Sequence, residues 1–586
     1  MNNRKTTSES NDGKLVSVAD QADTGRARRM GFRCAAVLAG LLPFMLLEIG
    51  LRCVDLGRPA DSSDPLSGFN RRSQLFERKG NVYRTARARE RFFLPQEFPA
   101  AKPPNGFRIF CLGGSTVYGH PYQADTAFPK WLELELNASD STRSFQILNC
   151  GGISYASYRL AFIVKEVLQY QPDLIILATG HNEFLEDRTY HSIKRRPPAW
   201  AWLQDTAYSL RTIALARRWM ANQKPPASHD TLVDEDSGLS QDVRARLDTA
   251  SGYAAYHRND AWRENVIAQF DESVRDIVAS CRAAGVPIML VKLGSNLRDC
   301  PPFKSEHRAG LTSDEEREWQ KAFDAATDAE DKHPGKALEL YRKAETIDEE
   351  YALLNYRIAR ILDQLGRITE ALTYYCKARD EDICPLRMIK PMEQSLARIA
   401  VETATPLLDA ARLLSAGSFD YIPGFECYLD HVHPNIGGHQ RIARALAAQM
   451  RVGGLLPKAA IWPEEKRQDT YARHLKQLGG RYFAEGKARV NWLENWARRE
   501  RLLEETFPRD ARGQVRLGFR RLDLGDEDAA WRCFAEALKR DPGTVELLRQ
   551  RARELISQGR PDYAASLLQQ VSTSTGNHDG PSNAGN

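Results

Sequence analysis

The sequence predicts an α/β protein in which a parallel sheet flanked by helices is interrupted by an all-helical insertion and followed by a second helical region. Three observations support this fold class. Short apolar runs alternate with amphipathic stretches from residue 107 to residue 293, which is typical of parallel strands joined by crossover helices. Small and aromatic residues recur at a fixed spacing in two later segments, which indicates paired helices. One apolar segment near the amino terminus is long enough to cross a membrane.

The composition excludes several classes of protein. The chain has 586 residues, and 82 Lys and Arg against 77 Asp and Glu leave a formal net charge of +5. This balance argues against a nucleic-acid-binding protein that depends on a strong basic field. Hydrophobic residues make up 42% and charged residues 27%, which excludes wholesale disorder. The 10 cysteines include no Cys-x-x-Cys pair, so zinc-ribbon and thioredoxin-like motifs are excluded as well.

The amino terminus predicts a membrane anchor. Residues 1–33 are polar, and we expect a disordered cytoplasmic tail. Residues 34–51 form an apolar stretch, and a helix of this length would extend about 27 Å, enough to cross a hydrocarbon core. Its one carboxylate, Glu48, precedes Arg52 by four residues and can pair with it. We therefore expect a single-pass transmembrane signal anchor with the bulk of the chain outside the cytoplasm; a cleaved signal peptide and a buried helix are the alternatives.

The α/β domain is expected in two parts, 106–312 and 385–458, after a linker at 52–105 that is rich in Arg, Pro and Ser. Apolar runs in the first part predict four buried strands, at 107–112, 145–149, 173–179 and 286–293. Amphipathic stretches between these runs predict helices, at 128–136, 158–170 and 260–284. This alternation favours a parallel sheet with helices on both faces.

A period of 34 residues predicts the two helical regions. In the insertion 313–384, three residues recur 34 positions later: Ala337, Tyr341 and Ala344 recur as Ala371, Tyr375 and Ala378. The same period relates residues of the segment 470–572, where Gly525, Ala530 and Phe534 recur as Gly559, Ala564 and Leu568. Both patterns resemble tetratricopeptide repeats, and that resemblance implies protein partners bound through the repeats. Residues 573–586 are expected to form a disordered tail.

Polar groups and glycines follow three of the predicted strands. Ser115 comes after Gly113 and Gly114, at the carboxyl end of the first strand, where α/β proteins place their chemistry; alternatively, Ser115 caps the next helix. Asn182 follows the third strand, and its side-chain amide either donates to an oxyanion or serves a turn. Gly152 follows the second strand, where it permits close approach of a backbone amide to a substrate or serves the turn alone.

A late Asp-x-x-His motif completes the candidate residues. Asp430 and His433 precede a predicted helix and can meet on one side of a turn, where the carboxylate would fix the imidazole tautomer. The alternative is a metal site, since His431 and His439 lie close in sequence. No second acidic cluster completes a usual ligand set, and we expect no metal.

These features, in this order, resemble the blocks of the SGNH (GDSL-like) hydrolase superfamily. The resemblance covers about 106–310 and 385–450. Gly-Gly-Ser-Thr and Gly-His-Asn-Glu take the places of the first and third blocks, as in membrane-tethered bacterial members that carry tetratricopeptide units. The spacing of the second block from Asn149 places its backbone donor on Ser154, with Gly152 as the alternative.

The resemblance implies acyl transfer without a metal or organic cofactor. Its catalytic residues would be Ser115, Asp430 and His433, and its oxyanion donors Ser115, Ser154 and Asn182. The implied enzyme is a periplasmic esterase or O-acyltransferase that acts on an acylated carbohydrate or a small ester. A second hypothesis belongs to a different class: the repeats form an assembly scaffold and the hydrolase-like domain is idle.

Overall fold

The computed structural model describes residues 35–36, 39–54, 56, 74–90, 92–194, 207, 210–222, 256–456, 462–498 and 510–576. The chain divides into two compact units. The smaller consists of Met1–Asn70 and Arg196–Thr231, and the larger of Arg71–Arg195 and Leu232–Asn586. The expected tail 1–33 lies outside the described residues. The expected tail 573–586 lies outside them from residue 577 onward.

The described part of the smaller unit contains a helix at 39–53 and α7 (Arg211–Asn222). Glu48 pairs with Arg52 at 2.8 Å, as expected, and also accepts a 3.0 Å hydrogen bond from the backbone N–H of Arg211 at the start of α7. No helix in the described ranges has both the length and the apolar character needed to cross a membrane. The expected anchor at 34–51 is helical from 39 to 51, and its residues 34, 37 and 38 lie outside the described residues.

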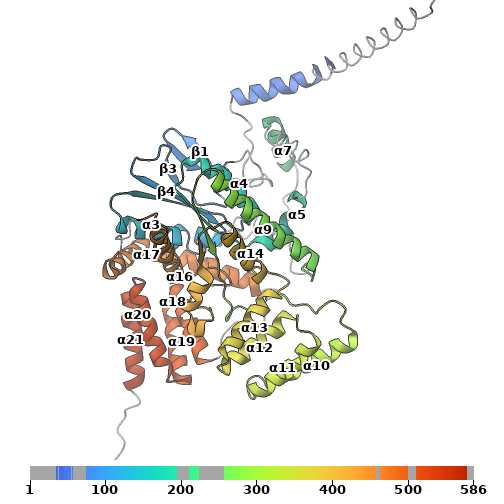
Figure 1. Ribbon diagram of the computed structural model, residues 1–586, viewed down its shortest axis with the longest axis vertical. Helices are drawn as coiled ribbons and strands as arrows, with labels where there is room; N and C mark the ends of the chain where they lie inside the picture. Colours follow the sequence, from blue (N-terminus) through green and yellow to red (C-terminus); the bar gives the residue numbers. More distant parts are fainter. Residues whose placement is uncertain are drawn as a thin grey trace, which may run out of the picture. The chain divides into compact units, whose positions relative to one another are not determined.

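A five-stranded parallel sheet forms the centre of the larger unit and confirms the predicted mixed α/β class (Figure 1). In spatial order its strands are β5 (Ser144–Gly151), β4 (Gly106–Gly113), β6 (Leu174–Ala178), β7 (Ile288–Lys292) and β8 (Leu407–Asp409). The first four in the chain coincide with the predicted runs. β8 was missed because three residues are too few to show an apolar pattern. The strand order reverses beside β4, so the carboxyl end of β4 opens at the switch point where such sheets bind ligands.

Helices cover both faces of the sheet. The side chains of β4 alternate, with Phe110 and Leu112 in one apolar core and Ile109 and Cys111 in the other. The first core is closed by α4 (Ser157–Val167), α9 (Asp260–Ala283) and α14 (Lys390–Glu402). The second is closed by α3 (Phe128–Ser139) and α16 (Ile436–Val452). Because burial occurs on both faces, the strands are continuously apolar in sequence.

The segment expected to be a linker is folded in its second half. An antiparallel sheet is formed there by β1 (Phe76–Lys79), β2 (Val82–Thr85) and β3 (Glu97–Pro99). Phe76 and Phe98 are buried against Phe110 of the central sheet. The linker interpretation is therefore wrong for this half. The frequent arginines make the segment polar on average. Its few aromatic residues are nevertheless buried, and their burial attaches the segment to the core.

The helical insertion consists of two hairpins. The first is formed by α10 (Ser313–Ala329) and α11 (Pro334–Ile347), and the second by α12 (Ala352–Gln364) and α13 (Ile368–Asp380). Every residue of the predicted period is buried, namely Ala337, Tyr341, Ala344, Ala371, Tyr375 and Ala378. Gly366 turns the chain between α12 and α13 with a φ of 75°, a conformation that favours glycine.

The carboxyl-terminal region is helical as expected. Its first part, α17 (Glu464–Arg498), consists of two helical pieces that meet at a kink at Gly479, where φ is 71° and ψ is 166°. Two hairpins follow, formed by α18 (Ala511–Asp523) with α19 (Glu527–Arg540) and by α20 (Thr544–Ser557) with α21 (Pro561–Gly576). α18 and α19 can approach closely because Gly518 of α18 has no side chain. A Cβ there would lie 2.4 Å from the ring of Phe534 in α19.

Candidate active site

Ser115 is the first residue of α2 (Ser115–Tyr118), directly beyond the carboxyl end of β4. The N-cap of α2 is Gly114, so Ser115 does not have the capping role. The two glycines before Ser115 are required by close neighbours. A Cβ at Gly113 would lie 2.1 Å from the carbonyl oxygen of Ala178, and one at Gly114 would lie 2.5 Å from Nδ2 of Asn182. The tight turn therefore brings Ser115 close to the end of β6.

His433 joins Ser115 to Asp430. Its Nε2 lies 2.7 Å from Oγ of Ser115, and its Nδ1 lies 2.6 Å from Oδ2 of Asp430. The other carboxylate oxygen of Asp430 accepts backbone hydrogen bonds from Val432 at 2.9 Å and from His433 at 2.8 Å. These bonds hold the carboxylate against the imidazole, which places three sequence-predicted residues in one hydrogen-bonded chain.

The charge of Asp430 determines the direction of these hydrogen bonds. Burial alone would raise the pKa of Asp430, but the charge and hydrogen bonds of His433 outweigh burial, and the pKa lies well below its ordinary value. The ionised carboxylate can only accept, so Nδ1 of His433 carries the proton. In the neutral ring Nε2 then presents a lone pair, and Ser115 donates its hydroxyl proton to it.

Three groups converge near Ser115 as candidate oxyanion donors. Asn182 lies beside Gly114 and donates one Nδ2 hydrogen to the carbonyl of Tyr155 at 3.1 Å. Its second hydrogen has no acceptor among the described residues. Among the described residues, the backbone N–H of Ser115 and that of Ser154 have no hydrogen-bond acceptor.

The backbone distinguishes the two candidates of the second block. The N–H of Gly152 donates to the carbonyl of Gly113 at 2.9 Å and is therefore occupied. Ser154 has a φ of 60°, a left-handed conformation that is uncommon for a residue with a side chain. Such strain occurs often at functional sites. These observations favour Ser154 over Gly152 as the donor.

Glu183, the last residue of the Gly-His-Asn-Glu motif, has a supporting position. Its carboxylate accepts hydrogen bonds from the backbone N–H of Ser157 at 2.8 Å and from the hydroxyl of Ser157 at 2.9 Å. Ser157 begins α4, so the negative charge lies at the positive end of that helix. Glu183 thus holds the start of α4 beside the end of β6.

Four further histidines lie around the site or behind it, three of them buried and His431 partly buried. His120 was not singled out from the sequence, and its ring centroid lies 4.7 Å from that of His433. Nδ1 of His439 accepts a 3.2 Å hydrogen bond from the backbone N–H of Phe128, which gives it a structural role. Burial, with repulsion from neighbouring histidines, lowers the pKa to about 3 in His120, His181 and His439 and to about 4 in His431. In the described part of the chain no cluster of three or more His, Cys, Asp or Glu has the arrangement of a metal site.

The carboxyl-terminal helices contact the loop that follows α2 and the segment that carries His433. Nε of Arg520 in α18 donates to the carbonyl of Leu429 at 2.6 Å, and Asp523 of α18 accepts a 2.8 Å hydrogen bond from Asn435. The backbone carbonyl of Asp523 also accepts a hydrogen bond from the hydroxyl of Tyr122, in the loop after α2. One end of α18 therefore spans the two sides of the candidate site.

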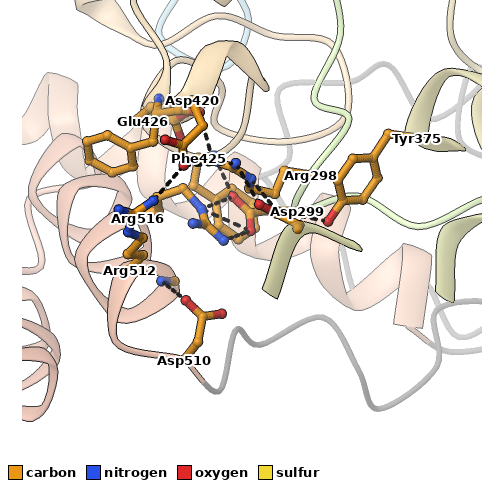
Figure 2. A network of polar contacts seen from close by, with 12 residues as sticks. Arg298, Asp299, Tyr375, Asp420, Phe425, Glu426, Asp510, Arg512 and Arg516 are labelled. Carbon is orange, nitrogen blue, oxygen red and sulfur yellow. Dashed lines mark hydrogen bonds and ion pairs between the residues drawn. The ribbon is translucent and has the colours of Figure 1, made fainter. Parts of the chain in front are cut away.

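An ionic network attaches the other end of α18. Arg516 lies beside Asp299 (Figure 2). Its Nε is 2.9 Å from the carboxylate of Asp299. The same carboxylate accepts a 2.9 Å hydrogen bond from the backbone N–H of Phe425. Arg512, one turn earlier, pairs with Asp420 at 2.6 Å. These contacts could not be predicted from the sequence, because an arginine on a helix carries no signal of its distant partner.

The comparison with protein families identifies one repeat in the helical insertion. Residues 352–378 match the tetratricopeptide repeat family, over most of α12 and α13. This match confirms the predicted repeat in the insertion. A search of curated proteins finds no match.

Proposed function

We propose that this protein is a serine-dependent ester hydrolase or O-acyltransferase of the SGNH type. The observation that carries the proposal is the position of His433 between Ser115 and Asp430, with 2.7 Å to the hydroxyl and 2.6 Å to the carboxylate. This arrangement of a nucleophile, a base and an orienting carboxylate supports covalent acyl transfer.

The proposed reaction begins with attack of the Ser115 oxygen on an ester carbonyl. His433 takes the hydroxyl proton on Nε2, and the charge of Asp430 stabilises the resulting imidazolium. The oxyanion accepts hydrogen bonds from the N–H groups of Ser115 and Ser154 and from Nδ2 of Asn182, and losing one such donor typically costs about 10²–10³ in rate. The C–O bond to the alcohol then breaks and His433 returns its proton to the leaving oxygen. Water or a second alcohol accepts the acyl group from Ser115.

The proposed substrate is an acylated carbohydrate, and the proposed location is the periplasmic side of a membrane. Anchoring rests on the apolar sequence 34–51 and on the arginines before it. Protease digestion of intact spheroplasts tests the location, since an extracytoplasmic domain would be degraded while a cytoplasmic control protein survives. Protection of the domain until the membrane is permeabilised would contradict it.

Labelling with a fluorophosphonate and hydrolysis of p-nitrophenyl acetate test the enzymatic proposal. We expect Ser115→Ala to abolish both in the purified full chain. Ser141→Ala is the matched control, because Ser141 is exposed on the loop before β5. Labelling that persists in Ser115→Ala would remove Ser115 from the mechanism.

The repeat match favours a second function, binding of a protein partner. Between the helical insertion and α18 lies a cleft of about 590 Å³. Its lining contains more acidic than basic side chains, including Asp331, Asp363, Asp510 and Asp541. A cationic peptide would complement this charge. The partner would be anchored beside the candidate enzyme, and the two functions are compatible.

Affinity purification with the full chain as bait, followed by rebinding of the purified partner, tests this second function. Gln364 is exposed and lines the cleft, so we expect Gln364→Trp to weaken rebinding by filling it. Ser115→Ala serves as the control that leaves the cleft intact. Equal affinity of both variants for the partner would contradict a role for the cleft.

A further inference from the structure

Buried polar groups gather at the carboxyl ends of β6 and β7, next to Ser115 and His433. The two strands are parallel neighbours, with Leu177 opposite Leu290, so the residues that follow them emerge at the same edge of the sheet. His181 follows β6 and Ser295 and Asn296 follow β7. All three are at least nine-tenths buried, with 6%, 4% and 0% of their surfaces exposed.

His181 holds a hydrogen-bond donor that the described residues leave unused. Its Nδ1 accepts a 3.0 Å hydrogen bond from the backbone N–H of Met388, so this nitrogen carries a lone pair. Burial keeps the ring neutral, with a pKa of about 3, and the single ring proton is therefore on Nε2. Nε2 is buried and has no partner among the described residues.

Asn296 and Ser295, which follow the adjacent strand β7, also have buried donors that the described residues leave unused. The Asn296 side-chain oxygen accepts a 2.9 Å hydrogen bond from the backbone N–H of Asp299, which fixes the orientation of the amide. Its Nδ2 and the hydroxyl of Ser295 are both buried without a partner in the described part of the chain. A buried donor without an acceptor costs about 1–3 kcal/mol, so three of them in one region call for a common acceptor.

Backbone contacts tie these residues to the segment that carries the candidate base. The N–H of Asn296 donates to the carbonyl of His431 at 3.0 Å, and Nη1 of Arg387 donates to the carbonyl of Asn296 at 3.0 Å. Arg387 immediately precedes Met388, which bonds to His181. The Arg387–Met388 segment therefore contacts both His181 and Asn296, and the backbone of Asn296 contacts His431, two residues before His433.

We propose that His181, Ser295 and Asn296 form a polar subsite that binds oxygen atoms of the alcohol part of the ester. This inference rests on the proposed acyl-transfer function. Three donors in one buried subsite suit a ligand with several closely spaced acceptor oxygens, such as a polyhydroxylated ring. A simple alkyl alcohol would leave these donors unpaired, which is how a buried polar site rejects a substrate that lacks its oxygens.

Two acetate esters of matched shape test the subsite: methyl 6-O-acetyl-glucopyranoside and cyclohexylmethyl acetate. Both place the ester on a CH₂ group attached to a six-membered ring, and only the first has ring and hydroxyl oxygens. Acetate release by the full chain gives the ratio of kcat/KM for the two esters. We expect the wild type to favour the glucoside, and Ser295→Ala to lower the ratio about 10-fold, the effect of 1.4 kcal/mol.

Two variants of His181 distinguish the donor on Nε2 from the acceptor on Nδ1, which bonds to Met388. The oxygen of Asn at this position can replace Nδ1 as the acceptor for Met388, so His181→Asn should keep the local fold and lower the ratio about as much as Ser295→Ala. The amide nitrogen of Gln reaches farther, to the place of Nε2, so His181→Gln should recover part of the ratio. Ser141→Ala should retain the wild-type ratio.

The outcomes distinguish the subsite from the proposed function. A ratio unchanged in both Ser295→Ala and His181→Asn would overturn the subsite, and these donors would then serve internal water. The same holds if the wild type shows no preference between the two esters while Ser115-dependent turnover persists. Failure of the wild type to cleave either ester by a Ser115-dependent route would overturn both proposals.

Discussion

Arg520 in α18 donates a 2.6 Å hydrogen bond to the carbonyl of Leu429, the residue directly before Asp430. Arg520 is 2% exposed, and its guanidinium lies over the ring of Phe425, 4.7 Å from its centroid. The helical region that resembles a separate repeat array thus supports the turn on which Asp430 and His433 meet. Activity should therefore depend on α18, although α18 contributes no group to the proposed chemistry.

Replacing Arg520 tests this support. Arg520→Met leaves the carbonyl of Leu429 without its donor, and we expect kcat for p-nitrophenyl acetate to fall about 10-fold, since the loss of such a partner costs about 1–3 kcal/mol. Arg520→Lys retains a donor and should recover part of the rate. Arg521→Met is the control, because the ion pair of Arg521 with Asp526, at 3.7 Å, is partly exposed. Equal kcat in Arg520→Met and Arg521→Met would contradict the support.

Replacing Asp430 tests the tautomer of His433. Asp430→Asn preserves shape but offers an N–H or a neutral oxygen to Nδ1, so the ring no longer reliably presents its Nε2 lone pair to Ser115. We expect kcat to fall by about 10⁴, the loss seen when a triad carboxylate becomes an amide. Thermal unfolding followed by circular dichroism would show whether the fold is retained. A folded variant with near wild-type kcat would exclude Asp430 as the orienting group.

Removing the amide of Asn182 tests its role as a donor. Asn182→Ala deletes the Nδ2 hydrogens near Ser115 and leaves the hydroxyl, His433 and Asp430 in place. We expect kcat to fall about 10²–10³ while KM changes little, because the bond to the oxyanion forms only in the transition state. Steady-state kinetics with p-nitrophenyl acetate measure the two constants. A rise in KM at constant kcat would instead assign Asn182 to ground-state binding.

The buried histidines predict loss of stability in mild acid. The pKa of His439 is about 3 in the folded protein against an ordinary value of 6.5, chiefly because of burial, so the unfolded chain binds more protons between these values. Stability from this group is therefore present above pH 6.5 and is lost as the pH falls toward 3. His120, His181 and His431 act in the same direction.

A variant of His439 measures this effect. His439→Asn can keep an acceptor for the N–H of Phe128 and removes the titrating ring, so the free energy of unfolding should decline less steeply between pH 6.5 and pH 4. One proton corresponds to about 1.4 kcal/mol per pH unit. Urea unfolding at several pH values gives the slopes. His257→Asn is the control, because the side chain of His257 is 70% exposed. Identical slopes for the wild type and His439→Asn would show that His439 does not contribute.

Much of the fold follows from local sequence patterns. The runs around Phe110 and Ile175 predicted β4 and β6, because a strand buried on both faces is continuously apolar. The 34-residue period identified the buried faces of paired helices through Ala337 and Tyr341. The antiparallel strands near Phe76 escaped prediction, because isolated aromatic residues in a charged segment show no periodicity.

The sequence by itself determined which residues are available for the candidate chemistry and which strands they follow. Both could be predicted because apolar patterns and motifs are local properties of the chain. Only the tertiary structure decided that Ser115 and His433, 318 residues apart, are hydrogen-bonded. It also decided that the N–H of Gly152 has an acceptor, whereas that of Ser154 has none among the described residues. It also decided that Arg520 supports Leu429. These relationships depend on how distant segments pack, and packing brings together side chains whose positions in the sequence bear no regular relation to one another.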